Sequence, residues 1–169
     1  MDAPKFLILF LFAATVAWTR ARPGLSSLRQ GSSLKVEEES NFLVSPHGTF
    51  SSGFYKVGTN VSCYSIWYTK AVNKTVVWMA NRDTPVSERR SKLALHRNGN
   101  LLLTDGVGST VWSTNTLSNA SMKFQLQLLE TGNLVLINHI RGSSGRVLIL
   151  PQIHSYHLSN LTRAQPWWP

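Results

Sequence analysis

The sequence predicts an all-β fold made of small antiparallel sheets. Runs of β-branched and aromatic residues, such as residues 64–68 and 75–79, have the length of strands. Gly, Asn and Ser separate these runs, and no segment from residue 22 to residue 138 repeats its apolar residues with the 3.6-residue period of a helix. Short motifs also recur along the chain, which indicates repeated structural units.

The N-terminus has the features of a secretory signal peptide. Lys5 precedes an apolar run over residues 6–18, and small residues follow near Ala21. The run is shorter than the roughly 20 residues of an ordinary transmembrane helix, although a short membrane anchor or a buried helix is the alternative. We therefore expect a signal peptide over residues 1–21, a polar leader over residues 22–33 and no further transmembrane segment.

Four N-glycosylation sequons agree with this secretory route, and they begin at Asn60, Asn73, Asn119 and Asn160. Cys63 is the only cysteine, so no disulfide can form within the chain and the fold relies on its apolar core. Cys63 is expected to be either a buried small apolar side chain or a thiol that pairs with another chain. The expected location is secreted and extracellular.

The chain is basic, with a formal net charge of +9. Removal of residues 1–21 takes away Lys5, Arg20 and Asp2 and leaves +8. Such a charge attracts anionic partners, but the densest basic cluster is only residues 89–92 and no nucleic-acid-binding motif accompanies it. We therefore expect no nucleic-acid partner. Anionic cell-wall or membrane contacts and a merely solvated basic surface both remain open.

No catalytic or metal-binding pattern is present. Residues 96–98 read His-Arg-Asn, which lacks the Asp of a kinase catalytic loop. His154 and His157 have the spacing of a metal pair but no third ligand nearby in the sequence. The sequence therefore predicts a non-enzymatic protein without a metal site or a cofactor.

The strongest hairpin signal is Asn98-Gly99, which lies between two short apolar runs. Both residues tolerate the positive φ that a tight turn requires. The sequence Gly-Asn-Leu recurs at Gly132, 33 residues after Gly99, and a related turn lies at Gly48. Repeated units of this length bury their apolar faces by packing against one another, so we expect three small sheets around a shared axis.

Tryptophans mark the matching strands of these repeats. Trp78 and Trp112 stand 34 residues apart in related Thr-Val-(Val)-Trp motifs that end in Asn. Together with Trp67 they are expected to be core anchors, each directed toward the interior. The alternative is that they are exposed platforms on which a sugar ring stacks.

The motifs at residues 75–86, 98–105, 111–115 and 128–136 closely resemble the bulb-type (mannose-binding, monocot-type) lectin domain. They are most similar to the ectodomain of plant S-domain (G-type lectin) receptor-like serine/threonine kinases. The resemblance covers roughly residues 28–138. It implies a β-prism of three sheets with pseudo-threefold symmetry, a lectin-like domain over residues 34–138 and location in the apoplast.

The resemblance also implies a sugar site, because that family binds mannose through the motif Gln-x-Asp-x-Asn-x-Val-x-Tyr. The turn gathers polar side chains for the sugar hydroxyls, and the Val contacts the apolar side of the ring. In the middle repeat the five positions are His96, Asn98, Asn100, Leu102 and Thr104. Four are polar, but Asn98 stands where the motif has Asp, so the charge-assisted acceptor is lost.

The other two repeats match the motif less well. In the third repeat only Asn133 and Val135 match, because the other positions are Leu129, Thr131 and Ile137. In the first repeat none of Ser45, His47, Thr49, Ser51 and Gly53 matches. The candidate sugar-binding residues are therefore the five of the middle repeat and Asn133. The alternative for Asn100 and Asn133 is a turn asparagine that bonds the backbone.

The chain departs from the family pattern after residue 138. The third Trp strand is absent, so the third sheet is incomplete unless residues 147–150 supply the missing strand. Residues 139–169 form a divergent tail that we expect to be poorly ordered. No kinase domain fits in this length, so the resemblance is to a short form without the kinase.

These observations predict a secreted, glycosylated module that binds mannose-type glycans or cell-wall carbohydrate through degenerate sites. The alternative is a protein-interaction or dimerisation ectodomain that has lost sugar binding. A third hypothesis is a fragment whose unfinished third sheet prevents stable folding.

Overall fold

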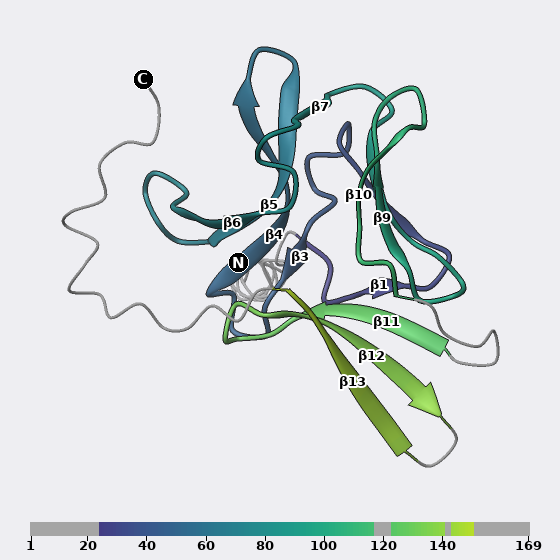
Figure 1. Ribbon diagram of the computed structural model, residues 1–169. Coiled ribbons are helices and arrows are strands. Elements are labelled where there is room, and N and C mark those ends of the chain that lie inside the picture. Colours follow the sequence, from purple (N-terminus) through teal and green to yellow (C-terminus); the bar gives the residue numbers. More distant parts are fainter. Residues whose placement is uncertain (1–23, 117–122, 141–142, 151–169) are drawn as a thin grey trace, which may run out of the picture.

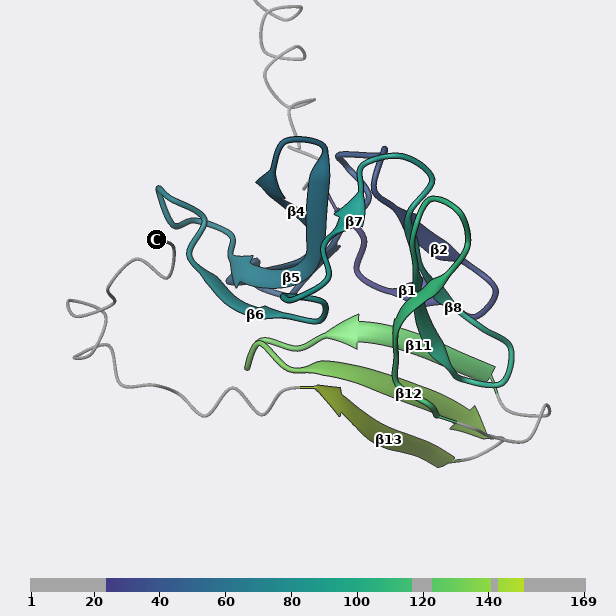
Figure 2. The ribbon, with the colours of Figure 1, turned by 45° about the horizontal axis from the view of Figure 1, so that its top comes forward.

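A computed structural model describes residues 24–116, 123–140 and 143–150 of the chain. In these ranges the regular elements are all strands, and they form three antiparallel sheets (Figures 1 and 2). The strands are β1 (Leu28–Arg29), β2 (Ser33–Lys35), β3 (Leu43–Val44), β4 (Phe50–Gly58), β5 (Val61–Tyr68), β6 (Val76–Met79), β7 (Val86–Ser87), β8 (Lys92–Leu95), β9 (Leu101–Thr104), β10 (Thr110–Ser113), β11 (Lys123–Leu128), β12 (Leu134–Ile140) and β13 (Ser143–Leu150). The prediction of an all-β fold with three small sheets is confirmed.

The first sheet has the order β3-β4-β5-β6, and β7 pairs with the start of β5. The hairpin of β4 and β5 forms its centre, with Phe50 opposite Tyr68 and Phe54 opposite Tyr64. β3 is short and pairs only with Ser51 and Ser52 of β4. The outer part of β4 therefore has one strand neighbour, β5, among the described residues.

The second sheet has the order β10-β9-β8-β2, and the third has the order β1-β11-β12-β13. β1 pairs with β11 through Leu28 and Leu126, although 98 positions separate them in the sequence. β13 pairs with β12, so residues 147–150, the stretch that could replace the missing Trp strand, are present as the end of β13. Paired strands therefore run from residue 28 to residue 150 and extend beyond the expected boundaries at residues 34 and 138.

A single apolar core lies between the three sheets. Alternate residues of the strands point inward, as a half-buried sheet requires. The first sheet contributes Leu43, Phe50, Tyr64, Ile66 and Val86, the second Leu34, Leu93, Leu95, Leu101 and Leu103, and the third Leu28, Phe124, Leu126, Leu128, Leu134 and Leu136. No sheet could bury its apolar face alone, which is the reason that the sequence repeats.

The three predicted tryptophan anchors do not all lie in this core. Trp78 and Trp112 pack against it and against each other, with ring centroids 6.2 Å apart and an interplanar angle of 71°. Trp67 is buried as well, and more fully than these two, but its side chain lies on the face of the first sheet that points away from the core. Its cross-strand partner there is Ser51. On this face Trp67 contacts Phe42 and Tyr55 rather than the central core.

Three hairpin turns share one conformation. Gly48, Gly99 and Gly132 have φ angles of 75°, 80° and 79°. Each glycine donates its N–H to the carbonyl oxygen three residues earlier, in Ser45, His96 and Leu129 respectively. A positive φ is costly for residues with a Cβ, which explains why Gly recurs at this position.

Cys63 is buried, and its Sγ lies 3.5 Å from the carbonyl oxygen of Asn81. This agrees with the expectation of a small apolar side chain rather than a surface thiol. Within the described ranges no helix is long and apolar enough to cross a membrane. The proposed signal peptide, the sequons at Asn119 and Asn160 and the pair His154 and His157 lie outside the described residues.

Candidate functional site

The middle hairpin carries five of the six candidate sugar-binding residues. It consists of β8, the turn at residues 96–100 and β9. Lys92 pairs with Thr104 and Ala94 pairs with Leu102, whereas Leu93 and Leu103 are buried in the core. Leu102 and Thr104 therefore lie on the outer face of the second sheet, as the motif requires.

The turn presents three exposed polar side chains, those of His96, Arg97 and Asn98. The Asn98 side-chain oxygen accepts a hydrogen bond from the backbone N–H of Asn100 at 3.0 Å. The backbone N–H of His96 in turn donates to the carbonyl oxygen of Asn100 at 2.8 Å. These bonds fix the turn, and the described contacts leave the His96 imidazole exposed to solvent.

The Asn100 side chain is engaged in hydrogen bonds within the fold. Its side-chain oxygen accepts hydrogen bonds from the hydroxyls of Ser113 at 2.9 Å and Thr114 at 3.0 Å. The Thr114 hydroxyl also accepts from the backbone N–H of Leu101 at 3.0 Å. This network ties the end of β10 to the start of β9. The sequence had suggested a backbone partner for Asn100, but the partners are two side-chain hydroxyls.

The remaining two positions differ in exposure. Leu102 is half-buried and offers an apolar surface next to the turn. Thr104 is only 8% exposed and stands between Lys92 and Thr110 on neighbouring strands. The accessible groups in and next to the turn are therefore His96, Arg97, Asn98 and Leu102, whereas the exposed Lys92 lies at the other end of β8, opposite Thr104.

The first repeat uses its polar residues internally. The Ser45 hydroxyl accepts from the backbone N–H of Phe50 at 3.0 Å, and the Ser51 hydroxyl bonds that of Thr69 at 2.8 Å. A Cβ at Gly53 would lie 2.7 Å from the Cβ of Phe42, so Phe42 covers this position. The last motif position of this repeat therefore has no room for a side chain.

The third repeat has apolar residues at the first and last motif positions, where Leu129 and Ile137 replace Gln and Tyr. Val135 is 3% exposed and Ile137 is 8% exposed, so both are buried. Asn133 is half-buried next to the turn and is engaged within the fold, whereas Thr131 is exposed. Asn133 belongs to the third sheet and is not part of the middle hairpin.

Glu130 links two of the hairpin turns. One carboxylate oxygen accepts from the backbone N–H of His47 at 3.0 Å, and the other accepts from the Thr49 hydroxyl. These bonds, led by the one from Thr49, lower the pKa of Glu130 to about 2. No group of three His, Cys, Asp or Glu side chains within the described ranges could hold a metal ion.

Sequence reasoning missed the roles of Ser113, Thr114 and Glu130. The first two belong to a motif, Val-Trp-Ser-Thr-Asn, that was noticed for its tryptophan. The hydroxyl residues that follow the tryptophan in that motif are the sequence feature from which the hydrogen bonds to Asn100 could have been predicted.

The sequons at Asn60 and Asn73 lie on exposed turns, where a glycan has room.

Comparisons with known proteins agree with the fold. Residues 75–149 match the family described as D-mannose binding lectin. The chain is 47% identical over 131 residues to a receptor protein kinase of Zea mays (ZmPK1), an alignment that covers 74% of this chain and 16% of that protein. It is 39% identical over 134 residues to the G-type lectin S-receptor-like serine/threonine-protein kinase B120 of Arabidopsis thaliana, covering 78% of this chain and 15% of that one. Each match therefore spans less than a fifth of the relative's length.

Among solved structures, the Japanese Marasmius oreades lectin has a similar fold. The TM-score is 0.54 at 17% sequence identity, and the superposition covers 73% of this chain and 87% of that one. This likeness concerns the arrangement of the three sheets.

Proposed function

The chain belongs to the D-mannose binding lectin family, and from this premise we propose that it is a non-catalytic module that binds mannose-type glycans weakly. The observation that supports the proposal is the outer face of the middle hairpin. There the exposed His96 and Asn98 lie in the turn that leads into β9, which carries the half-buried Leu102, so hydrogen-bonding groups and an apolar side chain occupy the same hairpin.

Weak binding follows from the groups that are missing or engaged. Asn98 supplies a neutral acceptor in place of a carboxylate, and neutral hydrogen bonds are about half as strong as charge-assisted ones. The Asn100 side-chain oxygen already accepts two hydroxyl protons. Each sugar hydroxyl left unpaired costs about 1–3 kcal/mol. We therefore propose one weak site in the middle repeat and none in the other two.

The proposal extends to the cellular setting. The relatives that match are receptor-like kinases, so we propose that this domain is extracellular and N-glycosylated at Asn60 and Asn73. The signal peptide over residues 1–21 fits the same setting. Treatment of the secreted chain with an N-glycosidase tests this part, and an unchanged electrophoretic mobility would contradict it.

The alternative function is a protein-interaction module that keeps the fold without sugar binding. The engagement of Asn100 and the covered last motif position of the first repeat favour it. The two functions make different predictions for variants of the middle hairpin, because only sugar binding depends on the side chains of its turn.

A glycan array with three variants separates these functions. Asn98→Asp restores a charged acceptor and keeps the bond to the Asn100 N–H, so we expect about fivefold tighter binding to mannose glycans. His96→Ala should weaken binding, and Thr131→Ala, at the equivalent exposed turn position of the third repeat, should not change it. A folded chain that shows no mannose binding even as Asn98→Asp would refute the lectin function and favour the alternative.

A further inference from the structure

A groove with a volume of about 760 Å³ runs along the outer part of β4, and its lining includes none of the residues 96–104 of the middle hairpin. Its aromatic lining consists of Phe42, Phe54, Tyr55 and Trp67. Trp67 is 8% exposed and stands between Phe42 and Tyr55, with ring centroids 6.2 Å and 6.3 Å away. The groove therefore has a firm aromatic floor.

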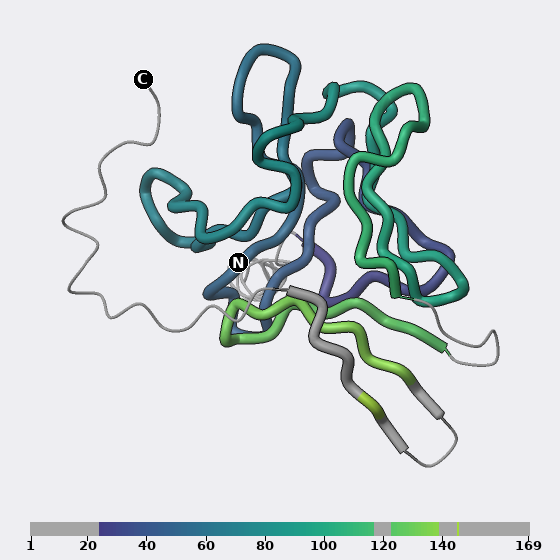
Figure 3. Tube along the Cα trace, in the orientation of Figure 1, coloured from purple at the N-terminus to yellow at the C-terminus, as the bar shows by residue number. Residues whose placement is uncertain are grey.

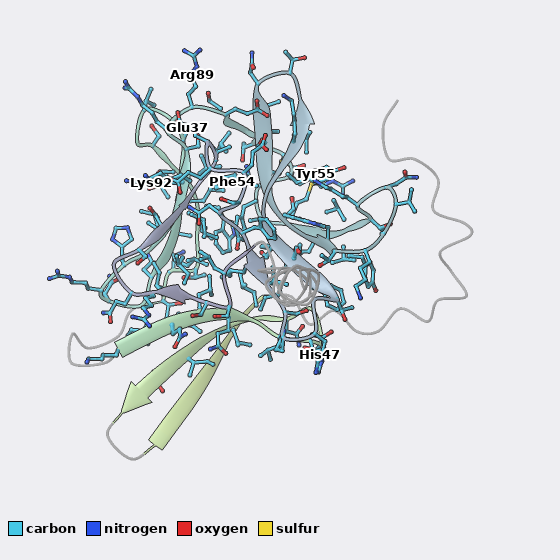
Figure 4. All side chains as sticks on the ribbon, turned by 180° about the vertical axis from the view of Figure 1, so that it is seen from behind. Glu37, His47, Phe54, Tyr55, Arg89 and Lys92 are labelled. Carbon is cyan, nitrogen blue, oxygen red and sulfur yellow. The ribbon has the colours of Figure 1, made fainter. Side chains whose placement is uncertain are left out.

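The groove touches both faces of the first sheet. Side chains alternate between the faces of a strand, so Phe54 and Lys56 lie on one face and Ser51 and Tyr55 on the other. All four line the groove. Figure 4 shows Phe54 on the side of Glu37 and Lys92, and Tyr55 on the opposite side. A continuous groove with walls on both faces must pass around an open edge of the sheet.

That open edge belongs to β4. The other side of β5 is paired with β6 and β7, whereas β3 pairs with β4 only at Ser51 and Ser52. Phe42 then covers Gly53, and the regular pairing with β5 ends at a bulge after Lys56. Phe54–Lys56 thus present one side of their backbone without a strand partner in the described part of the chain. Figures 1 and 3 show this hairpin projecting from the rest of the fold.

The charges around the groove differ from those of the chain. Four of the eight Asp and Glu residues line it, but only three of the seventeen Lys and Arg residues do. Lys35 pairs with Glu38 at 2.9 Å and Lys56 pairs with Glu88 at 3.2 Å. Glu37 and Glu39 are exposed and form no ion pair with a described residue. The groove is therefore an acidic site on a chain with a net charge of +9.

We propose that this groove binds an extended basic segment of a partner protein, which adds to the free edge of β4 as a further strand. The backbone of the segment pairs with Phe54–Lys56. The side chains of the segment alternate between the part of the groove beside Phe54 and the part lined by Trp67. The Lys or Arg residues of the segment face Glu37 and Glu39. A peptide fits better than a neutral glycan, because it offers backbone groups at the spacing of a strand and cationic side chains for the acidic lining.

The test uses linear dodecapeptides displayed on phage and selected against the full folded chain. We expect the selected peptides to be rich in Lys and Arg. Their affinity should fall on the order of tenfold when Glu37→Gln and Glu39→Gln are combined, because two facing charges are lost. Asp83→Asn removes an exposed carboxylate outside the groove and should leave the affinity unchanged.

Two N-methylated versions of a selected peptide test strand addition directly. An added strand points alternate N–H groups toward β4, so methylation of one alternate set should abolish binding and methylation of the other should not. Selection of no peptide, equal binding of both methylated versions, or displacement of the peptide by a mannose oligosaccharide would each overturn the proposal. Sugar binding at the middle hairpin is measured separately, so the two proposals fail independently.

Discussion

Substitution of Glu130 by Gln should weaken the tie between the first and third hairpin turns. The carboxylate accepts from the His47 N–H at 3.0 Å and from the Thr49 hydroxyl, 81 residues away in the sequence. In the Glu130→Gln variant the new side-chain oxygen would accept from the His47 N–H, and the amide N–H₂ would donate to the Thr49 hydroxyl, which can also accept. Two hydrogen bonds to a charged carboxylate would therefore be replaced by two weaker neutral ones.

The size of the effect follows from the charge and the exposure of Glu130. Hydrogen bonds to a charged group contribute about 1.5–3 kcal/mol each when they are buried. The side chain is 32% exposed, so solvent screens part of this contribution. We expect the free energy of unfolding to fall by about 1–2 kcal/mol at pH 7.

The pH dependence gives the sharper test. The folded pKa of Glu130 is about 2, below its ordinary value of 4.5. A lowered folded pKa stabilises the protein above the unfolded value and loses this contribution as the pH falls through the folded value. The difference in the free energy of unfolding between wild type and Glu130→Gln should thus reach its maximum above pH 4.5 and shrink as the pH falls toward 2.

Urea denaturation at several pH values between 7 and 2 measures this difference. Glu39→Gln is the matched control, because Glu39 is exposed and no ion pair is described for it. A stability difference that does not change between pH 7 and pH 2 would refute the role of the Glu130 carboxylate.

Three further predictions concern the core and the turns. The pKa of the Cys63 thiol is raised by burial, so a thiol reagent should modify it in urea but not in the native protein, and rapid native modification would contradict its burial. Trp112→Ala should lower the free energy of unfolding by about 2 kcal/mol. A double-mutant cycle with Trp78→Ala should show a coupling energy of about 0.5–1.5 kcal/mol, and additive effects of the two substitutions would exclude the ring contact. Gly99→Ala should cost about 1–2 kcal/mol, because φ is +80° and the new Cβ would lie 3.1 Å from the Phe124 ring; an unchanged melting temperature would contradict this.

The sequence predicted what depends on local pattern. The recurring glycines mark turns that share a positive φ, and the alternation of Leu93 and Leu95 with their neighbours identifies the core face of the second sheet. The matching motifs around Trp78 and Trp112 marked equivalent strands of two repeats, and the contact between their rings is a finding of the structure.

The pairing of strands far apart in the sequence could not be predicted from such local patterns. The two-residue strand β1 becomes visible only when β11 lies beside it, so Leu28 was assigned to a leader. The face on which Trp67 lies depends on strand register, because a shift of one residue moves a side chain to the other face. Likewise the engagement of Asn100 depends on Ser113 and Thr114, which the fold brings back from the next strand.

The middle hairpin is the proposed weak mannose site of this chain. Titration of the isotope-labelled protein with a mannose oligosaccharide, followed by NMR chemical shifts of the backbone amides, tests this most directly. We expect saturable shifts at His96, Asn98 and Leu102, with no comparable shifts at Thr131 and Asn133. Shifts confined to the first or third repeat, or no saturable shifts at millimolar sugar, would contradict it.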